Sequence, residues 1–469
     1  MTTIEQRGET KRMSMLQDML SALVSRGARL MEGRDGTYSA ESLEALCQAL
    51  LSSRGEASGV ALASEILRGF DTLDEEGRKA FLILLGEPYD PDPERVARAA
   101  AAYRENHTNE ALAELIAASE PPRQELLRRL NLAPGGTPAL VHMREALLPL
   151  LADNPALARV DADFGRLFSS WFNRGFLVLR HIDWETPAHI LEKIIEYEAV
   201  HAIHTWDELR RRVQPADRRC FAFFHPSMPD DPLIFVEVAL SREIPNSIQT
   251  LLSEEREVLS PDKATTATFY SISNCQTGLR GVSFGNFLIK QVAEDLAHEI
   301  PGLKTFVTLS PAPGLTRWIQ AQAEKDPDGR AAQALALTAT EGWHRDEDVA
   351  GKAEPLIKGL AAEYYLNAKR PDGQPIDPVA RFHLGNGAML RQIDWLGDTS
   401  SKGLAQSAGV MVNYLYDLGE VEANHEAYAT RREVKAARSV RSLVPSTERK
   451  AKKPEIEKPE IEKKDKDTA

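Results

Sequence analysis

Cysteine is scarce in this sequence. Among 469 residues there are three, Cys47, Cys220 and Cys275, and none belongs to a Cys-x-x-Cys pair. Disulfide frameworks and cysteine-based zinc sites both depend on several cysteines at close, regular spacings. The sequence therefore indicates a reducing compartment and no structural zinc.

Long apolar runs and a surplus of basic residues are also missing. No stretch approaches the ~20 apolar residues that span a membrane, and the N-terminus lacks the cationic-then-apolar pattern of a secretory signal. The 57 Lys and Arg residues against 70 Asp and Glu residues give a net charge of −13, which disfavours a nonspecific nucleic-acid binder. We expect a cytoplasmic protein that binds neither membrane nor nucleic acid.

The first part of the chain is patterned as helices. The whole chain exceeds the ~250–300 residues that one hydrophobic core serves, so two or more domains are expected. From Met15 to about Leu179, apolar residues recur at three- and four-residue intervals. Asp92-Pro93-Glu94 has the N-cap, first-position proline and acidic first turn of a helix start. We predict an all-α bundle over residues 1–183, with a packing or oligomerisation role.

After Trp184 the pattern changes to strands mixed with helices. Apolar strand-like runs cover Cys220 to Phe224, Leu233 to Leu240, Thr266 to Ser273 and Lys304 to Leu309. A helix is expected from Phe287 to Ile300, and helical patterning returns from Ala331 to Asn367. This alternation predicts an α+β protein, with a mixed-sheet α/β domain over residues 184–438.

The last part of the chain is polar and charged. Pro454-Glu-Ile-Glu-Lys458 is followed directly by its repeat, Pro459-Glu-Ile-Glu-Lys463. A segment with almost no large apolar residues cannot bury enough surface to offset the entropy lost on ordering. We therefore predict a disordered tail over residues 439–469.

A glycine-bearing turn between a strand and a helix is the first candidate binding site. It consists of Arg280, Gly281, Val282, Ser283, Phe284, Gly285 and Asn286. Backbone N–H groups at a helix N-terminus bind phosphate, and an arginine adds a charged contact. The turn resembles the acyl-CoA-binding turn of the N-acetyltransferase (GNAT) fold, although Ser283 stands at its middle glycine. A plain strand-to-helix turn is the alternative.

Several motifs in order extend this resemblance to one family. Phe269-Tyr-Ser-Ile-Ser273, the turn, Leu309-Ser-Pro-Ala-Pro-Gly314 and Phe382-His-Leu-Gly-Asn-Gly-Ala388 resemble the malonyl-CoA decarboxylase family. The similarity runs from about Arg219 to Tyr416. It implies an acetyltransferase-like catalytic domain, malonyl-CoA as the substrate, and a homo-oligomer, expected to be a homotetramer, built through the helical region.

The resemblance also implies site residues. Ser310 and His383 match the catalytic serine and histidine, while Ser271 and Tyr416 match residues of the substrate pocket. From the residues alone, Ser310 could be a turn serine, His383 a packing histidine and Tyr416 a core tyrosine, with His225 as the alternative catalytic histidine. Many relatives carry glutamate at the position of Ser283, so an electrostatic role there does not carry over.

The implied chemistry needs few groups. Loss of carbon dioxide from malonyl-CoA leaves an enolate in which the thioester accepts the electron pair. No other electron acceptor is needed, so we expect no metal, no pyridoxal phosphate and no biotin. A proton donor and a group that stabilises the enolate suffice. Two other functions stay open: a CoA-dependent acyltransferase, and a non-enzymatic acyl-CoA sensor.

Overall fold

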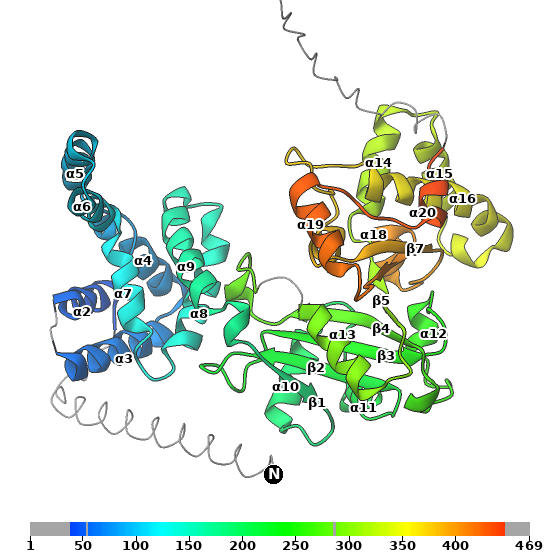
Figure 1. The fold of residues 1–469 in the computed structure, drawn as a ribbon, viewed down its shortest axis with the longest axis horizontal. Helices are drawn as coiled ribbons and strands as arrows, with labels where there is room; N and C mark the ends of the chain where they lie inside the picture. The colour runs from blue at the N-terminus through cyan, green and yellow to red at the C-terminus, as the bar shows by residue number, and fades with distance from the viewer. Residues whose placement is uncertain (1–37, 53–54, 285–287, 446–469) are drawn as a thin grey trace, which may run out of the picture. The chain divides into compact units, whose positions relative to one another are not determined.

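The computed structural model describes residues 38–52, 55–284 and 288–445 (Figure 1). The chain divides into two compact units. One comprises Met1–Val213, Cys220–Val236 and Ile272–Asn286, and the other comprises Gln214–Arg219, Glu237–Ser271 and Phe287–Ala469. The helix predicted from Met15 lies outside the described residues.

The first unit begins with helices, as predicted. Its described α-helices before the first strand are α2 (Ala40–Ser52), α3 (Glu56–Thr72), α4 (Glu75–Leu84), α5 (Pro93–Asn106), α6 (Asn109–Ser119), α7 (Pro122–Leu130), α8 (Gly136–Leu147) and α9 (Ala158–Trp171). The predicted start at Pro93 is confirmed, because the Asp92 side chain accepts a hydrogen bond from the Glu94 N–H. Asp74 caps α4 in the same way through the Gly77 N–H. Local capping thus sets several helix boundaries.

The helical region has an apolar core with a buried ion network inside it. Arg123 on α7 is 1% exposed, and its Nε donates to Asp163 Oδ2 over 2.7 Å. Its Nη1 donates to the carbonyl oxygens of Leu85 and Gly86. A buried guanidinium is costly unless its donors are satisfied, and here they are.

In the described part of the chain, eight strands form one mixed sheet. They are β1 (Val178–Ile182), β2 (Arg218–Phe224), β3 (Ile234–Ser241), β4 (Thr266–Asn274), β5 (Thr305–Thr308), β6 (Ser310–Pro311), β7 (Met389–Asp394) and β8 (Met411–Leu415). The order is β1-β2-β3-β4-β5-β8-β6, with β7 also paired to β8. β4 and β5 are parallel, whereas β8 runs antiparallel to β5, β6 and β7. A helical region followed by a mixed-sheet α/β region is therefore confirmed.

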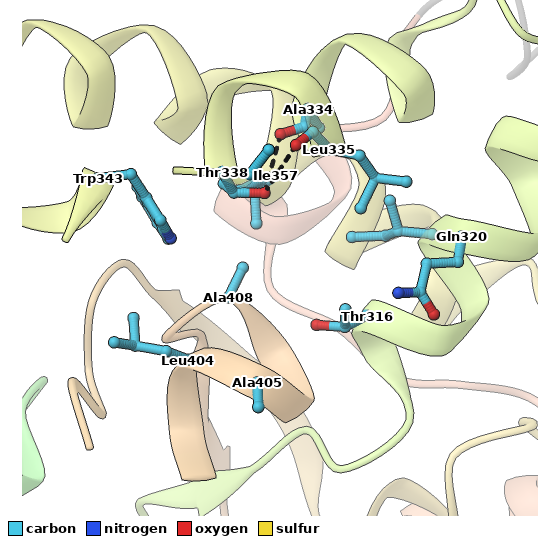
Figure 2. Close-up of a pocket in the computed structure, with 12 residues that line it drawn as sticks. Thr316, Gln320, Ala334, Leu335, Thr338, Trp343, Ile357, Leu404, Ala405 and Ala408 are labelled. Carbon is cyan, nitrogen blue, oxygen red and sulfur yellow. Dashed lines mark hydrogen bonds between the residues drawn. The ribbon is translucent and has the colours of Figure 1, made fainter. Parts of the chain in front are cut away.

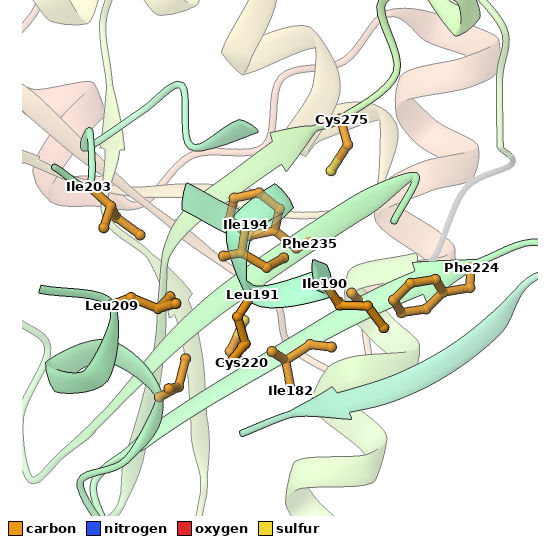
Figure 3. Close-up of a cluster of buried hydrophobic side chains, with 12 residues drawn as sticks. Ile182, Ile190, Leu191, Ile194, Ile203, Leu209, Cys220, Phe224, Phe235 and Cys275 are labelled. Carbon is orange, nitrogen blue, oxygen red and sulfur yellow. The ribbon is translucent and has the colours of Figure 1, made fainter. Parts of the chain in front are cut away.

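Helices α10 (Ala188–Tyr197) and α11 (Trp206–Val213) pack on the first strands. Figure 3 shows the apolar cluster between them, with Ile190, Leu191 and Ile194 of α10 facing Cys220, Phe224 and Phe235 of the strands. Because Cys220 and Cys275 both lie in this cluster, they serve as small apolar side chains. All three cysteines are buried free thiols.

The remaining helices belong to the second unit. They are α12 (Ile248–Leu252), α13 (Leu288–Glu299), α14 (Leu315–Lys325), α15 (Arg330–Thr338), α16 (Glu347–Leu366), α17 (Pro378–Gly385), α18 (Ser401–Ser407), α19 (Val421–Arg431) and α20 (Arg438–Ser442). The predicted helices after Phe287 and after Ala331 are confirmed. No described helix is long and apolar enough to cross a membrane.

Two element boundaries differ from the sequence predictions. β1 begins at Val178, inside the region predicted to be helical, because its backbone pairs with β2. α20 occupies the first residues of the predicted disordered tail, and the burial of Val440 and Val444 explains its order. Both differences arise from long-range contacts that short windows of sequence do not contain.

Candidate active site

Ser310 and His383 are in contact although 73 positions separate them in sequence. Ser310 Oγ lies 3.1 Å from His383 Nε2. Both side chains are buried, with 5% and 2% of their surface exposed. This separation is within the ~2.6–3.2 Å over which hydrogen-bonded groups pass a proton. The two side chains are therefore close enough for a proton to pass between them.

A change of strand partner places Ser310. The sequence predicted one strand from Lys304 to Leu309, but β5 ends at Thr308, and Ser310 begins β6, which pairs with β8. Leu309 still donates its N–H to Phe269 O of β4. Immediately after it, Ser310 leaves that neighbour and donates its hydroxyl hydrogen to Thr308 Oγ1 over 2.8 Å.

A capped helix places His383. α17 starts at Pro378, and the preceding Asp377 accepts the Ala380 N–H over 2.7 Å. The second carboxylate oxygen of Asp377 accepts the hydroxyl of Tyr364 over 3.0 Å. Asp377 is fully buried, and that burial raises its pKa. The helix carrying His383 is therefore anchored at its N-terminus by a carboxylate inside the protein.

Tyr414 of β8 and Tyr416, the first residue after that strand, enclose the imidazole. Tyr414 stacks on it with ring centroids 4.5 Å apart and an interplanar angle of 25°. The Tyr416 hydroxyl lies 2.8 Å from His383 Nδ1. Burial lowers the pKa of His383 to about 3 and raises the pKa of Tyr416 well above its usual value. The imidazole is therefore neutral at physiological pH, beside a phenol that keeps its proton.

One face of the sheet carries these groups. β4 and β5 place Phe269 opposite Thr308, and β5 and β8 place Val307 opposite Leu415. Because side chains alternate along a strand, Thr308, Tyr414 and Tyr416 share the face of Phe269. Ser271, two residues after Phe269 and buried, belongs to the same face. The structure thus brings Ser310, His383 and Tyr416 together and puts Ser271 on their side of the sheet.

The predicted CoA-binding turn lies in the other unit. Arg280, Gly281 and Ser283 are exposed, whereas Val282 and Phe284 are buried. Gly281 has φ +79°, a conformation that glycine adopts without strain. Gly285 and Asn286 lie outside the described residues. The described part of the turn therefore presents backbone and an arginine to solvent.

The alternative histidine, His225, has a structural role. Its Nε2 lies 3.1 Å from Trp171 O, and its Nδ1 accepts the Ser227 N–H over 3.1 Å. Both ring nitrogens are therefore engaged with backbone groups.

A separate cavity of about 280 Å³ lies between α14, α15, α16 and α18 (Figure 2). Its wall is mostly apolar and includes Ile319, Leu335, Ile357 and Leu404, and Thr316 and Gln320 add polar groups. Neither Ser310 nor His383 lines it. Among the described residues, no group of three or more His, Cys, Asp or Glu side chains is placed to hold a metal ion.

Comparison with known families shows the family of this chain. Residues 175–454 match the model of the malonyl-CoA decarboxylase C-terminal domain, and residues 89–172 match that of the N-terminal domain. The chain belongs to the malonyl-CoA decarboxylase family. Its activity is that of a carboxy-lyase acting on malonyl-CoA.

Individual members of the malonyl-CoA decarboxylase family are similar along most of their length. The mitochondrial malonyl-CoA decarboxylase of Anser anser anser is 34% identical over 83% of this chain and 84% of its own. The crystal structure of malonyl-CoA decarboxylase from Rhodopseudomonas palustris is 55% identical, with a TM-score of 0.83, and covers 86% of this chain and 100% of its own. That from Agrobacterium vitis is 54% identical, with a TM-score of 0.82 over 86% of this chain and 99% of its own.

Sequence reasoning missed two groups of this candidate site. Thr308 accepts hydrogen bonds from Ser310 and from the Tyr414 N–H, and Tyr414 stacks on His383. The sequence carries a signal for Tyr414, because it lies two residues before Tyr416 and residues two apart in an extended segment share a face. The strand itself was not predicted, so the signal was not used.

Proposed function

We propose that Ser310 and His383 carry out the decarboxylation of malonyl-CoA in this chain. The supporting observation is the 3.1 Å contact between these two buried side chains, which come from different elements. Ser310 contacts the malonyl group, and His383 supplies the proton that completes acetyl-CoA. CoA-binding energy holds the acyl end in place while the bond breaks.

The reaction has two steps, cleavage of the bond to the carboxylate and protonation of the enolate. The bond between the α-carbon and the carboxylate breaks, carbon dioxide leaves, and the electron pair moves into the thioester to form an enolate. The α-carbon then takes a proton from His383 Nε2, while the Ser310 hydroxyl turns its hydrogen from Thr308 Oγ1 to the enolate oxygen and stabilises it. One proton from solvent is consumed in each turnover, and it restores His383.

The substrate itself prepares His383 for this role. In the free protein burial keeps the imidazole neutral, with a pKa of about 3. A malonyl carboxylate beside the ring is an anion, and a nearby anion raises the pKa of a histidine. Binding of the carboxylate therefore favours uptake of the proton. The Tyr416 hydroxyl can donate to Nδ1 in the neutral ring and accept from it in the imidazolium, so it serves both states.

The CoA part of the substrate is assigned to the turn of residues 280–286. Arg280 and the exposed backbone of Gly281 suit a pyrophosphate, because N–H groups and a guanidinium both bind anions. Val282 and Phe284 are buried and hold the turn to the protein. Ser271 is assigned to the pocket of the acyl group on the face of Ser310.

The test is single-turnover decarboxylation by purified protein, without an acceptor amine. Ser310→Ala and His383→Ala should each slow release of carbon dioxide by about 10²–10⁴-fold, the usual worth of a positioned proton donor. His225→Ala is the matched control and should decarboxylate at the normal rate. Normal rates in both Ser310→Ala and His383→Ala would refute the catalytic role of the two residues. An inert thioester would favour acyl transfer, and tight CoA-ester binding without turnover would favour a sensor.

Self-association is proposed for the helical region. α6 exposes Leu112 by 38% and Ile116 by 60%, and these residues are four apart on one helical face. Together with α5, α6 forms a helical hairpin within the first unit (Figure 1). An exposed apolar stripe of this kind suits a contact with a second copy of the chain, and a homotetramer built through this region remains the proposal.

A further inference from the structure

The turn assigned to CoA rests directly on helix α8. It directly follows a short 3₁₀-helix, η6 (Thr277–Leu279), which packs on α8. A Cβ atom at Gly278 would lie 2.0 Å from Val141 O of α8. Real Cβ atoms do not approach backbone oxygen so closely, so only glycine allows this contact. The backbone just before the turn is thus in direct contact with the backbone of α8.

Arg144 of α8 fastens the same turn by hydrogen bonds. Its Nη1 donates to Gly278 O over 2.7 Å and to Arg280 O over 2.9 Å. Its Nε donates to Asp161 Oδ1 over 2.8 Å, which holds the guanidinium in place. Arg144 is 5% exposed, so these charge-assisted bonds form away from water and are among the stronger ones.

The hydrogen bond from Arg144 to Arg280 O orients the N–H group of the same peptide unit, that of Gly281. A peptide unit is planar and its C=O and N–H point in opposite directions, so fastening Arg280 O to Arg144 turns the Gly281 N–H away from α8. No hydrogen bond among the described residues uses that N–H. Gly281 is exposed, and its φ of +79° is a backbone conformation that residues other than glycine adopt only with strain.

We propose that Arg144 is a positioning residue for acyl-CoA binding: it holds the carbonyl groups of Gly278 and Arg280 so that the described part of the turn presents the Gly281 N–H to the CoA pyrophosphate. The helical region is then part of the substrate-binding apparatus and not only a surface for self-association. This inference rests on the assignment of CoA to the turn of residues 280–286.

The experiment measures CoA affinity and kinetics of the full-length chain. Arg144→Lys keeps a positive charge beside Asp161 but loses the planar fork that reaches two carbonyl groups. Titration calorimetry with CoA should show Kd rising about tenfold, the effect of losing one such hydrogen bond. KM for malonyl-CoA should rise by a similar factor, while kcat stays within about twofold, because Arg144 does not touch the reacting atoms.

Two further variants separate the possible outcomes. Arg123→Lys alters another buried arginine of the helical region, one that donates to the carbonyl groups of Leu85 and Gly86, and should leave Kd and KM unchanged. Gly281→Val strains the turn itself and should weaken CoA binding directly. If Gly281→Val weakens binding and Arg144→Lys does not, the inference is wrong while the turn assignment stands.

The other outcomes are equally decisive. Unchanged affinity in both the Gly281 and Arg144 variants would overturn the turn assignment and the inference with it. An equal loss in Arg123→Lys and Arg144→Lys would mean general loosening of the helical region and would overturn the positioning role. If Arg144→Lys does not fold, Asp161→Asn replaces it and should raise Kd about threefold, since it only weakens the hold on the Arg144 guanidinium.

Discussion

Replacing Tyr416 by phenylalanine removes one atom from the site and leaves the ring in place. That atom, the hydroxyl oxygen, lies 2.8 Å from His383 Nδ1. Ser310 donates its hydrogen to Thr308 Oγ1, so Ser310 Oγ is free to accept from His383 Nε2. Tyr416 then donates to Nδ1, and the proton of the neutral imidazole resides on Nε2, facing the serine. The variant deletes the group that selects this tautomer.

The magnitude follows from the burial of the pair. Tyr416 is 1% exposed and His383 2%, so water does not replace the lost hydroxyl. A buried polar atom left without its partner costs about 1–3 kcal/mol. If this cost falls on the orientation that the transition state needs, kcat drops about 10- to 100-fold, at about 1.4 kcal/mol for each factor of ten. KM should change little, because the hydroxyl is engaged with His383 and not with CoA.

The assay is steady-state release of carbon dioxide from malonyl-CoA, together with urea unfolding of both proteins. Tyr428→Phe is the matched control, since it also deletes a buried tyrosine hydroxyl, one with no hydrogen-bond partner among the described residues. It should retain wild-type kcat. A kcat for Tyr416→Phe within twofold of wild type would refute the role of the hydroxyl in setting the tautomer.

Three further outcomes are expected. The pKa of His383 is about 3 in the folded protein against an ordinary 6.5, so between these pH values the unfolded chain binds more protons than the folded one. The free energy of unfolding therefore falls as pH drops through this range, by up to about 1.4 kcal/mol per pH unit. Urea unfolding should show a shallower fall with pH in His383→Gln than in wild type, and parallel profiles would contradict this. A Cβ at Gly314 would lie 2.5 Å from the Tyr364 hydroxyl, so Gly314→Ala should cost about 1–3 kcal/mol of stability by overpacking, and a loss unchanged in a Tyr364→Phe background would point elsewhere. Light scattering of Ile116→Glu should show a lower oligomeric state than wild type; a wild-type chain that is monomeric at micromolar concentration would end the self-association proposal.

Periodic patterns were the part of the fold that could be predicted from the sequence. Helical spacing before Leu179 and the cap at Asp92 predicted the helical region, because helix faces and caps depend on residues three or four apart. The signals for the strands around Cys220, Leu233 and Thr266 were equally local, because each strand is a continuous apolar run. In contrast, β6 and β8 were not predicted. β6 has two residues and β8 has five, and their strand character comes from pairing with neighbouring strands, β6 with β8 and β8 also with β5 and β7.

The sequence by itself determined which residues were candidates for the site, and the tertiary structure decided how they meet. Motif order singled out Ser310, His383 and Tyr416, because residue types in a string are visible without a fold. Their contacts needed folding, since the pair is 73 positions apart and burial, which sets the pKa of His383, is a property of everything packed around it. The same holds for Arg144, 134 positions before the carbonyl group it binds at Gly278. A buried arginine in a helix carries no local sign of its acceptor, and only the packing of the turn on α8 reveals it.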